Sequence, residues 1–504
     1  MKFRVPLSLL LSAALALPLA GCGREAPPPP EPPPAAESSR PAEETRTESF
    51  ALAVLPGAGL HPVLCGSRIN LGLSPLLYEP LFQLDGRFEA RPVLCARYTV
   101  SPDKLVWTFT LRSDPVFSDG TPLTGQAAAD ALELARGAGS RFAPRLAGIR
   151  SVEAQGQDLT ITLRQPNGRL PLLLDIPIAL GSGDTPPGTG PYVPAGPEEA
   201  PRLDARPDWW QHKKLPASSL PLRPVRDTDG LSHAFAAGEV SLVDADLAEA
   251  GVSGCPGNSE IRDYPTSDLL FLGFNTRRGF CRSTKARSAV SEALDRDALA
   301  RTAWAGRAVP AVSPFHPACG LAPGEDLLSG GPEETGSADR RVSPAGQPPV
   351  LLVSTESAAK LQAAQLIAQQ LESAGIPVRV RKLDFTRYLK ALQDGNFDFY
   401  LGETVLTADF DLRPLLAPDG ALNYGGWKPL RAPELLDSLA AAGTDEAPGA
   451  AESLLELLTQ DPPFAPICFK NGSVLTRWGM LSGLSPVRGN IFYCLEDWSI
   501  RSEK

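Results

Sequence analysis

The chain has 504 residues, and its 58 acidic and 48 basic side chains give a formal net charge of −10 at pH 7. The basic residues are scattered rather than clustered, which argues against a nucleic acid as partner, because phosphate binding needs concentrated positive charge. The length allows two or three packed domains of roughly 100–200 residues each.

The first 21 residues have the pattern of a secretory signal peptide. Lys2 and Arg4 supply a positive start, and residues 5–19 are almost wholly apolar and end in small residues. A finished helix of this length is too short for a hydrocarbon core of about 30 Å. We therefore expect residues 1–21 to be removed on export and exclude them from the fold.

A cysteine follows this segment at the expected cleavage point. Leu19-Ala20-Gly21-Cys22 matches the bacterial lipobox, whose cysteine receives diacylglycerol and becomes the first residue of the mature protein. The alternative is a plain signal peptide followed by a chance cysteine. Because two acyl chains give the stable anchoring that one chain does not, we expect Cys22 to hold the protein on the extracytoplasmic face of the cell membrane.

Residues 22–49 have the composition of a tether. Pro27–Pro30 and Pro32–Pro34 favour the extended polyproline conformation, which makes a semi-rigid spacer. Almost no apolar residue is present to drive collapse. We expect the folded part to begin near Phe50.

Beyond Phe50, two segments alternate large apolar residues with smaller or polar ones. These segments, 105–111 and 158–164, are predicted to be strands with one buried face. Between them, Ser118–Pro122 is typical of a turn, and Thr124 is placed to cap a following helix.

Later segments predict one α/β lobe. A helix is expected over 284–304, and a strand–helix–strand–helix–strand run follows it. The strands of that run are 349–354, 376–380 and 397–401, and its helices are 357–374 and 386–394. Such alternation predicts parallel strands joined by right-handed crossovers. Residues 183–201 and 320–348, rich in glycine and proline, are expected to be surface connections.

Catalytic and metal-binding motifs are absent from the sequence. It has no G-x-S-x-G, H-E-x-x-H or P-loop pattern, and its four histidines are far from one another. Besides Cys22 the cysteines are Cys65, Cys95, Cys255, Cys281, Cys319, Cys468 and Cys494. Seven is an odd number, so at least one thiol stays unpaired or pairs outside the chain, and no C-x-x-C suggests zinc. We expect no enzyme, cofactor or metal.

Several segments, in order, resemble the large substrate-binding proteins of peptide and nickel ABC importers, family 5 of the extracellular solute-binding proteins. They are Leu77–Phe82, Asp85-Gly86, Tyr98–Asp103, Trp107–Arg112, Phe117–Thr124, Gly188–Tyr192, Arg206–Trp210, Leu272–Thr276 and Ala293–Leu299. The resemblance spans roughly residues 50 to 500.

The resemblance implies an α/β fold of the type II periplasmic-binding-protein class, with two hinged lobes of mixed sheets and a small inserted domain. The implied boundaries are 50–75, 188–270 and 478–504 for lobe I, 76–187 for the inserted domain and 271–477 for lobe II. The hinge is expected near Phe274–Thr276, where the chain passes between lobes.

The resemblance also suggests a ligand site. Thr407–Asp411 is similar to the segment in which peptide-binding members present a carboxylate to the peptide α-ammonium, and it assigns that role to Asp409. A buried ammonium needs such a charge-assisted partner. Backbone groups of Val405 and Thr407 are expected to pair with the ligand main chain like an added strand. The alternative is that Asp409 caps a helix beginning near Leu412, for which Asp411 is an equally good cap.

Three further residues are candidate ligand contacts. Tyr78 and Glu79 match a family position near the cleft of the first lobe, and Trp427 is a candidate aromatic wall. For each of them, core packing is the alternative interpretation.

These features predict a lipid-anchored, monomeric binding protein that delivers a peptide to the permease of an ABC importer by closing two lobes. Alternative ligands are a metallophore or an oligosaccharide. A further alternative is a sensory subunit that presents its ligand to a receptor.

Overall fold

A computed structural model describes residues 50–250, 258–323, 343–344 and 346–501. The chain divides into a unit of residues 1–46 and a unit of residues 47–504, and the fold below concerns the second unit. The predicted signal peptide, the tether with Cys22, and Cys255 lie outside the described residues. Among those described, no helix combines the length and apolar character needed to cross a membrane.

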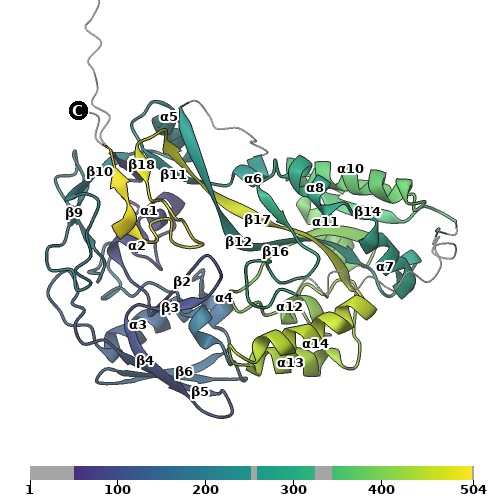
Figure 1. The fold of residues 1–504 in the computed structure, drawn as a ribbon, viewed down its shortest axis with the longest axis horizontal. Coiled ribbons are helices and arrows are strands. Elements are labelled where there is room, and N and C mark those ends of the chain that lie inside the picture. The colour runs from purple at the N-terminus through teal and green to yellow at the C-terminus, as the bar shows by residue number, and fades with distance from the viewer. Residues whose placement is uncertain (1–49, 251–257, 324–342, 345, 502–504) are drawn as a thin grey trace, which may run out of the picture. The chain divides into compact units, whose positions relative to one another are not determined.

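A four-stranded mixed sheet forms the core that we assign to lobe I (Figure 1). Its strands, in spatial order, are β1 (Leu52–Val54), β10 (Ser219–Pro224), β9 (Arg202–Ala205) and β8 (Tyr192–Ala195). Around it lie α1 (Arg68–Gly72), α2 (Ser74–Leu77), α5 (Thr228–Ala236), β18 (Leu481–Ser482), η3 (Leu495–Asp497) and β19 (Ser499–Ile500). Phe50 and Trp498 pack edge to face, so both ends of the described chain share this core.

A second, antiparallel sheet lies within residues 76–187. Its strands, in spatial order, are β4 (Cys95–Val100), β5 (Val106–Leu111), β7 (Asp158–Leu163) and β6 (Ile149–Gln155). Also here are β2 (Phe82–Leu84), β3 (Ala90–Pro92), α3 (Gly125–Arg136), α4 (Ala143–Leu146) and η1 (Leu170–Leu173). Both predicted strands are confirmed, and Thr124 caps α3 by accepting from the amide of Ala127 at 3.2 Å.

The third sheet has seven strands and carries the core that we assign to lobe II. In spatial order they are β11 (Leu242–Ala245), β17 (Phe464–Arg477), β12 (Ser259–Phe274), β16 (Phe399–Val405), β14 (Val350–Ser354) and β15 (Arg379–Leu383), with β13 (Ala308–Pro310) also pairing with β17. Strand β14 is parallel to both β15 and β16, as predicted.

Helices cover both faces of this sheet (Figure 1). One face packs on α7 (Thr284–Glu292), α8 (Arg296–Ala303) and α10 (Ala358–Ser373), near α6 (Leu247–Ala250) and η2 (Phe280–Arg282). The other packs on α11 (Phe385–Gln393), α12 (Arg413–Leu416), α13 (Ala432–Ala441) and α14 (Ala447–Gln460). Burial on both faces explains the apolar runs in its central strands.

Three sequence predictions need correction. The helix expected over 284–304 is two helices, because Asp295 caps α8 by accepting from the amide of Ala298 at 2.9 Å. The strand expected at 376–380 begins at Arg379, since the amide of Ile376 still bonds to Leu371 at the end of α10. Residues 183–201 are not only a surface connection, because they contain β8 with its buried Tyr192.

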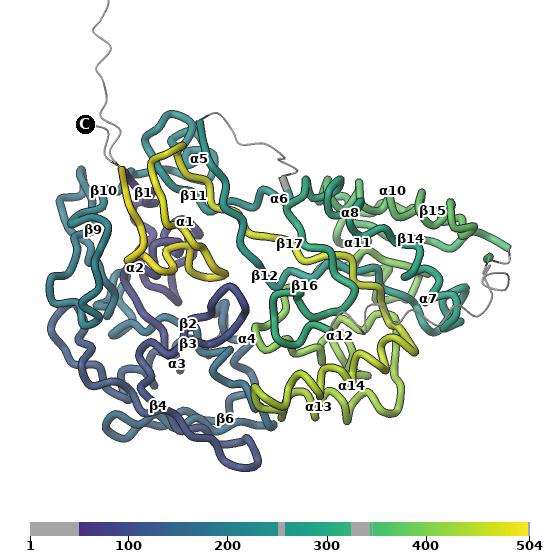
Figure 2. Tube along the Cα trace, viewed as in Figure 1, coloured from purple at the N-terminus to yellow at the C-terminus, as the bar shows by residue number. Residues whose placement is uncertain are grey.

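The chain passes between the two cores along β12 and β17, which pair side by side in Figure 2. Tyr264 and Val474 pack in the first core, whereas Leu269 and Phe469 pack in the third. The register of the two strands shifts between Pro265 and Leu269. A β-bulge bends and twists a strand locally, so the crossing lies at this irregularity.

The hinge expected near Phe274–Thr276 is therefore misplaced. The amide of Asn275 donates to Asp398, and its side chain donates to the carbonyls of Gly395 and Phe397. Thr276 donates to Gly425. All of these contacts lie within the third core region, so this segment belongs to the interior of one lobe.

Candidate functional site

A cavity of about 550 Å³, here called the interdomain cavity, lies between the small antiparallel domain and the C-terminal end of β16. Residues 404–409 line one side, and residues from α4, β7 and the loop before η1 line the other. This volume is in the range of about 300–1,000 Å³ that is usual for small-molecule sites. The structure thus brings Val405, Thr407 and Asp409 together in one cavity.

Asp409 is 6% exposed. One of its carboxylate oxygens accepts a hydrogen bond and the other does not, within the described structure. Its Oδ2 accepts from the Nδ2 of Asn167 at 3.1 Å. Its Oδ1, like the Oγ1 of Thr407, is buried without a hydrogen bond in the described part of the chain. Since an unpaired buried polar group is costly, these two oxygens are candidate acceptors for a ligand.

The turn that carries Asp409 is held by packing. The next residue, Phe410, has φ of 53°, a left-handed conformation that a bulky side chain adopts only under constraint. Its buried ring packs edge to face against Phe88, Phe315 and Phe469. The sheet core therefore fixes the direction in which Asp409 points.

The structure distinguishes Asp409 from the neighbouring carboxylate. Asp411 Oδ1 accepts from the amide of Arg413 at 3.1 Å, at the first residue of α12, and also lies 3.3 Å from the Nη1 of Arg413. Asp409 makes no such bond to α12. The capping alternative thus applies to Asp411 rather than to Asp409.

Strand β16 offers a backbone edge to this cavity. On one side, Thr404 and Val405 pair with Leu269 and Asp268 of β12. On the other side, β14 pairs only with Phe399 and Tyr400. Within the described strands, the outer edge at Thr404 and Val405 is thus unpaired, and Val405 is 59% exposed. An unpaired edge can accept an extended chain as an added strand.

Contacts between the small domain and the third core close this cavity. The amide of Gly168 donates to Ala440 at 2.8 Å, and the Nη2 of Arg169 donates to the carbonyl of Leu439 at 3.3 Å. On the C-terminal segment, the Nη1 of Arg488 donates to the carbonyl of Leu406 at 3.2 Å. Together with the Asn167–Asp409 bond, these contacts join the two sides around the cavity.

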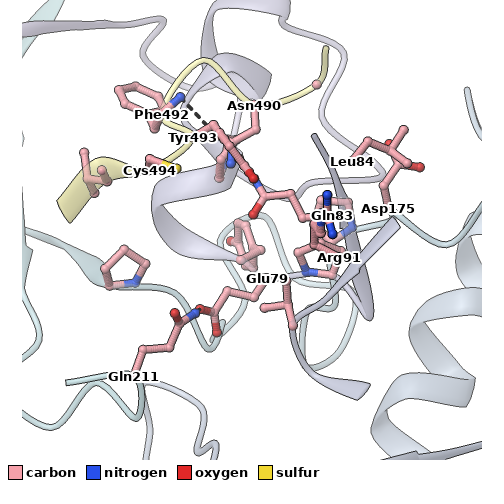
Figure 3. A pocket seen from close by; sticks show the side chains of 18 of the residues that line it. Glu79, Gln83, Leu84, Arg91, Asp175, Gln211, Asn490, Phe492, Tyr493 and Cys494 are labelled. Carbon is pink, nitrogen blue, oxygen red and sulfur yellow. Dashed lines mark hydrogen bonds between the residues drawn. The ribbon is translucent and has the colours of Figure 1, made fainter. Parts of the chain in front are cut away.

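A second cavity of about 510 Å³ lies beside the first core and contains Tyr78 and Glu79 (Figure 3). Tyr78 is 2% exposed and donates to the carbonyl of Pro186 at 3.1 Å. The structure therefore places Tyr78 and Glu79 together, but in a different cavity from Asp409.

Glu79 is fully engaged by the chain itself. Its carboxylate accepts from the indoles of Trp209 and Trp210 at 3.2 and 2.7 Å and from the side chain of Gln211 at 2.6 Å. Burial raises the pKa of Glu79, and the bond from Trp210 acts in the opposite direction. These bonds indicate a structural role in shaping the cavity wall.

Glu79→Gln is expected to lower the free energy of unfolding by about 1–3 kcal/mol, because an amide nitrogen would replace an acceptor facing an N–H donor. Chemical denaturation measures this change. Gln83→Glu, at another residue lining the same cavity, is the control. An unchanged stability of Glu79→Gln would contradict this structural role.

Trp427 lies in the core of the third sheet. It is 2% exposed, and its Nε1 donates to the backbone carbonyl of Asp461 at 2.9 Å. Neither cavity is lined by it. The expectation that Trp427 forms an aromatic wall for the ligand has no support from this position.

Sequence reasoning missed the residues that face Asp409 from the small domain. Asn167 and Gly168 form a common turn dipeptide, so local sequence indicates only a loop there. Asn167 and Asp409 are 242 positions apart. Only the fold brings them together, so the single sequence contains no signal for this contact.

Within the described residues, the cysteines and acidic groups form no further candidate site. Cys65, Cys95, Cys281, Cys319, Cys468 and Cys494 are free thiols. Across the described ranges, no group of three or more His, Cys, Asp or Glu side chains is arranged to hold a metal ion.

Comparison with known families gives a match over most of the folded unit. Residues 89–419 match the bacterial extracellular solute-binding proteins, family 5 Middle. Among characterised proteins, the chain is similar to the glutathione-binding protein GsiB of Salmonella typhi. The two are 24% identical over 388 residues, which cover 71% of this chain and 75% of the relative.

Solved structures show the same fold at low sequence identity. The nickel ABC transporter protein of Bacillus halodurans is 20% identical with a TM-score of 0.72, over 90% of this chain and 99% of that one. The oligopeptide-binding protein AppA of Bacillus subtilis, in complex with a nonapeptide, is 16% identical with a TM-score of 0.57, over 90% and 98%. The expected fold class, a type II periplasmic-binding-protein fold, is confirmed.

Proposed function

The chain belongs to the bacterial extracellular solute-binding proteins of family 5, and on that premise we propose that it captures a peptide between its lobes for an ABC importer. Members of this family bind solutes and are not enzymes, so the chain acts by binding and release outside the cytoplasm. Its proposed partner is the permease of the importer, to which the loaded protein delivers its ligand.

The observation that carries the peptide proposal is the unpaired Oδ1 of Asp409 beside the unpaired Oγ1 of Thr407. A peptide α-ammonium has three N–H donors and a positive charge, which suits this pair of acceptors in a buried site. The free edge at Thr404 and Val405 offers backbone groups for the ligand main chain. Recognition through the backbone accommodates many side chains.

Two of the similar proteins are described with ligands of this kind. GsiB is named for binding glutathione, and AppA is described with a nonapeptide. A nickel ABC transporter protein has the same fold, so the fold alone does not choose between these ligands. The proposal rests on the Asp409 site.

Identification of the natural ligand tests this function. The protein, purified from its own host without denaturation, is expected to release peptides that native mass spectrometry detects. Asp409→Asn purified in the same way is expected to release far less. Recovery of a metal chelate or an oligosaccharide from both proteins would contradict the peptide proposal.

We also propose that Cys22 anchors the protein through lipid. An alkyne fatty acid supplied to growing cells is expected to label the wild type and to leave Cys22→Ala unlabelled. Cys494→Ala, which removes a thiol that is not fully buried, is the control and should label like the wild type. Equal labelling of Cys22→Ala would refute the anchor.

A further inference from the structure

The interdomain cavity has a basic end in addition to Asp409. Arg141, Arg145 and Arg488 all line it. Arg145 lies in α4, and its Nη1 is 2.7 Å from the Oδ1 of Asp175. Arg488 also lines the second cavity, as does Asp175. The Arg145–Asp175 pair therefore lies where the two cavities adjoin.

The guanidinium of Arg145 has one nitrogen close to a carboxylate and two nitrogens without a hydrogen bond in the described structure. Its Nη1 faces Asp175, whereas its Nε and Nη2 are buried and make no hydrogen bond within the described structure. The ring of Phe142 packs on the guanidinium, with the central carbon 4.9 Å from the ring centroid. Stacking on a face of the guanidinium does not involve the Nε–Nη2 edge.

The Nε–Nη2 edge of an arginine is the geometry that binds a carboxylate through two parallel hydrogen bonds. A guanidinium stays charged in proteins, so it cannot reduce the cost of burial by losing a proton. The other two arginines have backbone partners, since Arg141 donates to Pro62 and Arg488 donates to Leu406. Of these three arginines, Arg145 is the one whose Nε and Nη2 are both buried without a hydrogen bond in the described structure.

We propose that the Nε–Nη2 edge of Arg145 binds a carboxylate of the ligand. The inference rests on the proposed peptide function and restricts the ligand to peptides that carry a carboxylate. With an ammonium at Asp409 and a carboxylate at Arg145, the ligand is a zwitterion held within one cavity of about 550 Å³. The carboxylate has two possible sources, the C-terminus of a short peptide or an acidic side chain.

Calorimetry on three sets of peptides tests this inference. The first set is oligoalanines of two to five residues as free acids, the second is the same peptides as C-terminal amides, and the third is amides with one glutamate. The wild type is expected to bind free acids about 30-fold or more tighter than amides, because breaking a buried charge pair is costly. If the glutamate amides regain that affinity, an acidic side chain can also supply the carboxylate.

Arg145→Gln is expected to remove the preference for the carboxylate, with little effect on the amides. Arg145→Lys keeps a positive charge beside Asp175 but lacks the two-pronged edge, so it should retain part of the preference. Arg150→Gln, at an exposed residue outside the cavity lining, is the control. Thermal unfolding of each variant separates a lost contact from a lost fold.

The outcomes separate this inference from the peptide function. Equal binding of acids, amides and glutamate amides would overturn the Arg145 site. If N-terminal acetylation still weakened the binding of these peptides, the peptide function would remain supported. A preference that persists in Arg145→Gln would also overturn the site. Failure of every peptide to bind the wild type would overturn both proposals.

Discussion

Asp409→Asn is expected to weaken the binding of peptides with a free N-terminus by a few hundredfold or more. The substitution keeps the shape of the side chain and the bond to Asn167, but it removes the charge that compensates the buried ammonium. Breaking a buried ion pair by removing one partner costs about 3–5 kcal/mol, which corresponds to such a change in affinity.

N-terminal acetylation supplies the second arm of this experiment. An acetylated peptide should bind the wild type poorly and lose little more in Asp409→Asn, because it brings no charge to compensate. Calorimetry on free and acetylated forms of one peptide, with both proteins, completes a double-mutant cycle. A coupling energy near zero would refute the role of Asp409.

Asp411→Asn is the matched control for Asp409. It makes the same charge change two residues away, at another residue lining the cavity. Its carboxylate is already bonded to Arg413, and asparagine can still accept from the amide that begins α12. Peptides with a free N-terminus should therefore bind Asp411→Asn nearly as well as the wild type.

The sequence predicted the local structure well where apolar periodicity and caps agree. Strand β14 and helix α10 lie within one residue of expectation, because Ser357 caps the helix and Gly375 ends it in a left-handed conformation. The helix over 284–304 failed because Asp295 is both compatible with a continuous helix and a good cap for a new one. Periodicity does not reveal such a break.

For the candidate site, the sequence predicted one side of the cavity and missed the other. Asp409, Thr407 and Val405 share one short segment, so a single motif includes all three. Asn167 and Arg145 face them from a different domain, and their roles depend on tertiary contacts across the cavity. Trp427 was predicted as a ligand contact but lies in the core. An aromatic side chain suits either place, so the sequence could not distinguish them.

The contact at Gly168 suggests how the two sides of the cavity respond to a ligand. A β-carbon built on Gly168 would lie 2.3 Å from the carbonyl oxygen of Ala442 and 2.4 Å from that of Ala441, at the end of α13. These are backbone atoms and cannot rotate away. Only glycine permits the approach through which Gly168 donates to Ala440.

Gly168→Ala is therefore expected to hinder closure and to weaken every ligand, whatever its terminal groups, by about tenfold or more. Overpacking of a tight contact costs about 1–3 kcal/mol, and a ligand that binds the closed state loses affinity as that state becomes less populated. Gly168 lacks the left-handed φ that would itself strain alanine, so the fold of the small domain should be unaffected.

Small-angle scattering measures the conformational part of this prediction. With saturating peptide, the radius of gyration should decrease for the wild type and decrease less for Gly168→Ala. Gly148→Ala is the control, because Gly148 lines the same cavity and a β-carbon there meets no atom within 4 Å. A Gly168→Ala protein that binds and contracts like the wild type would show that this contact does not govern closure. If Gly168→Ala loses affinity but its radius of gyration decreases as much as that of the wild type, the substitution affects contacts with the ligand rather than closure.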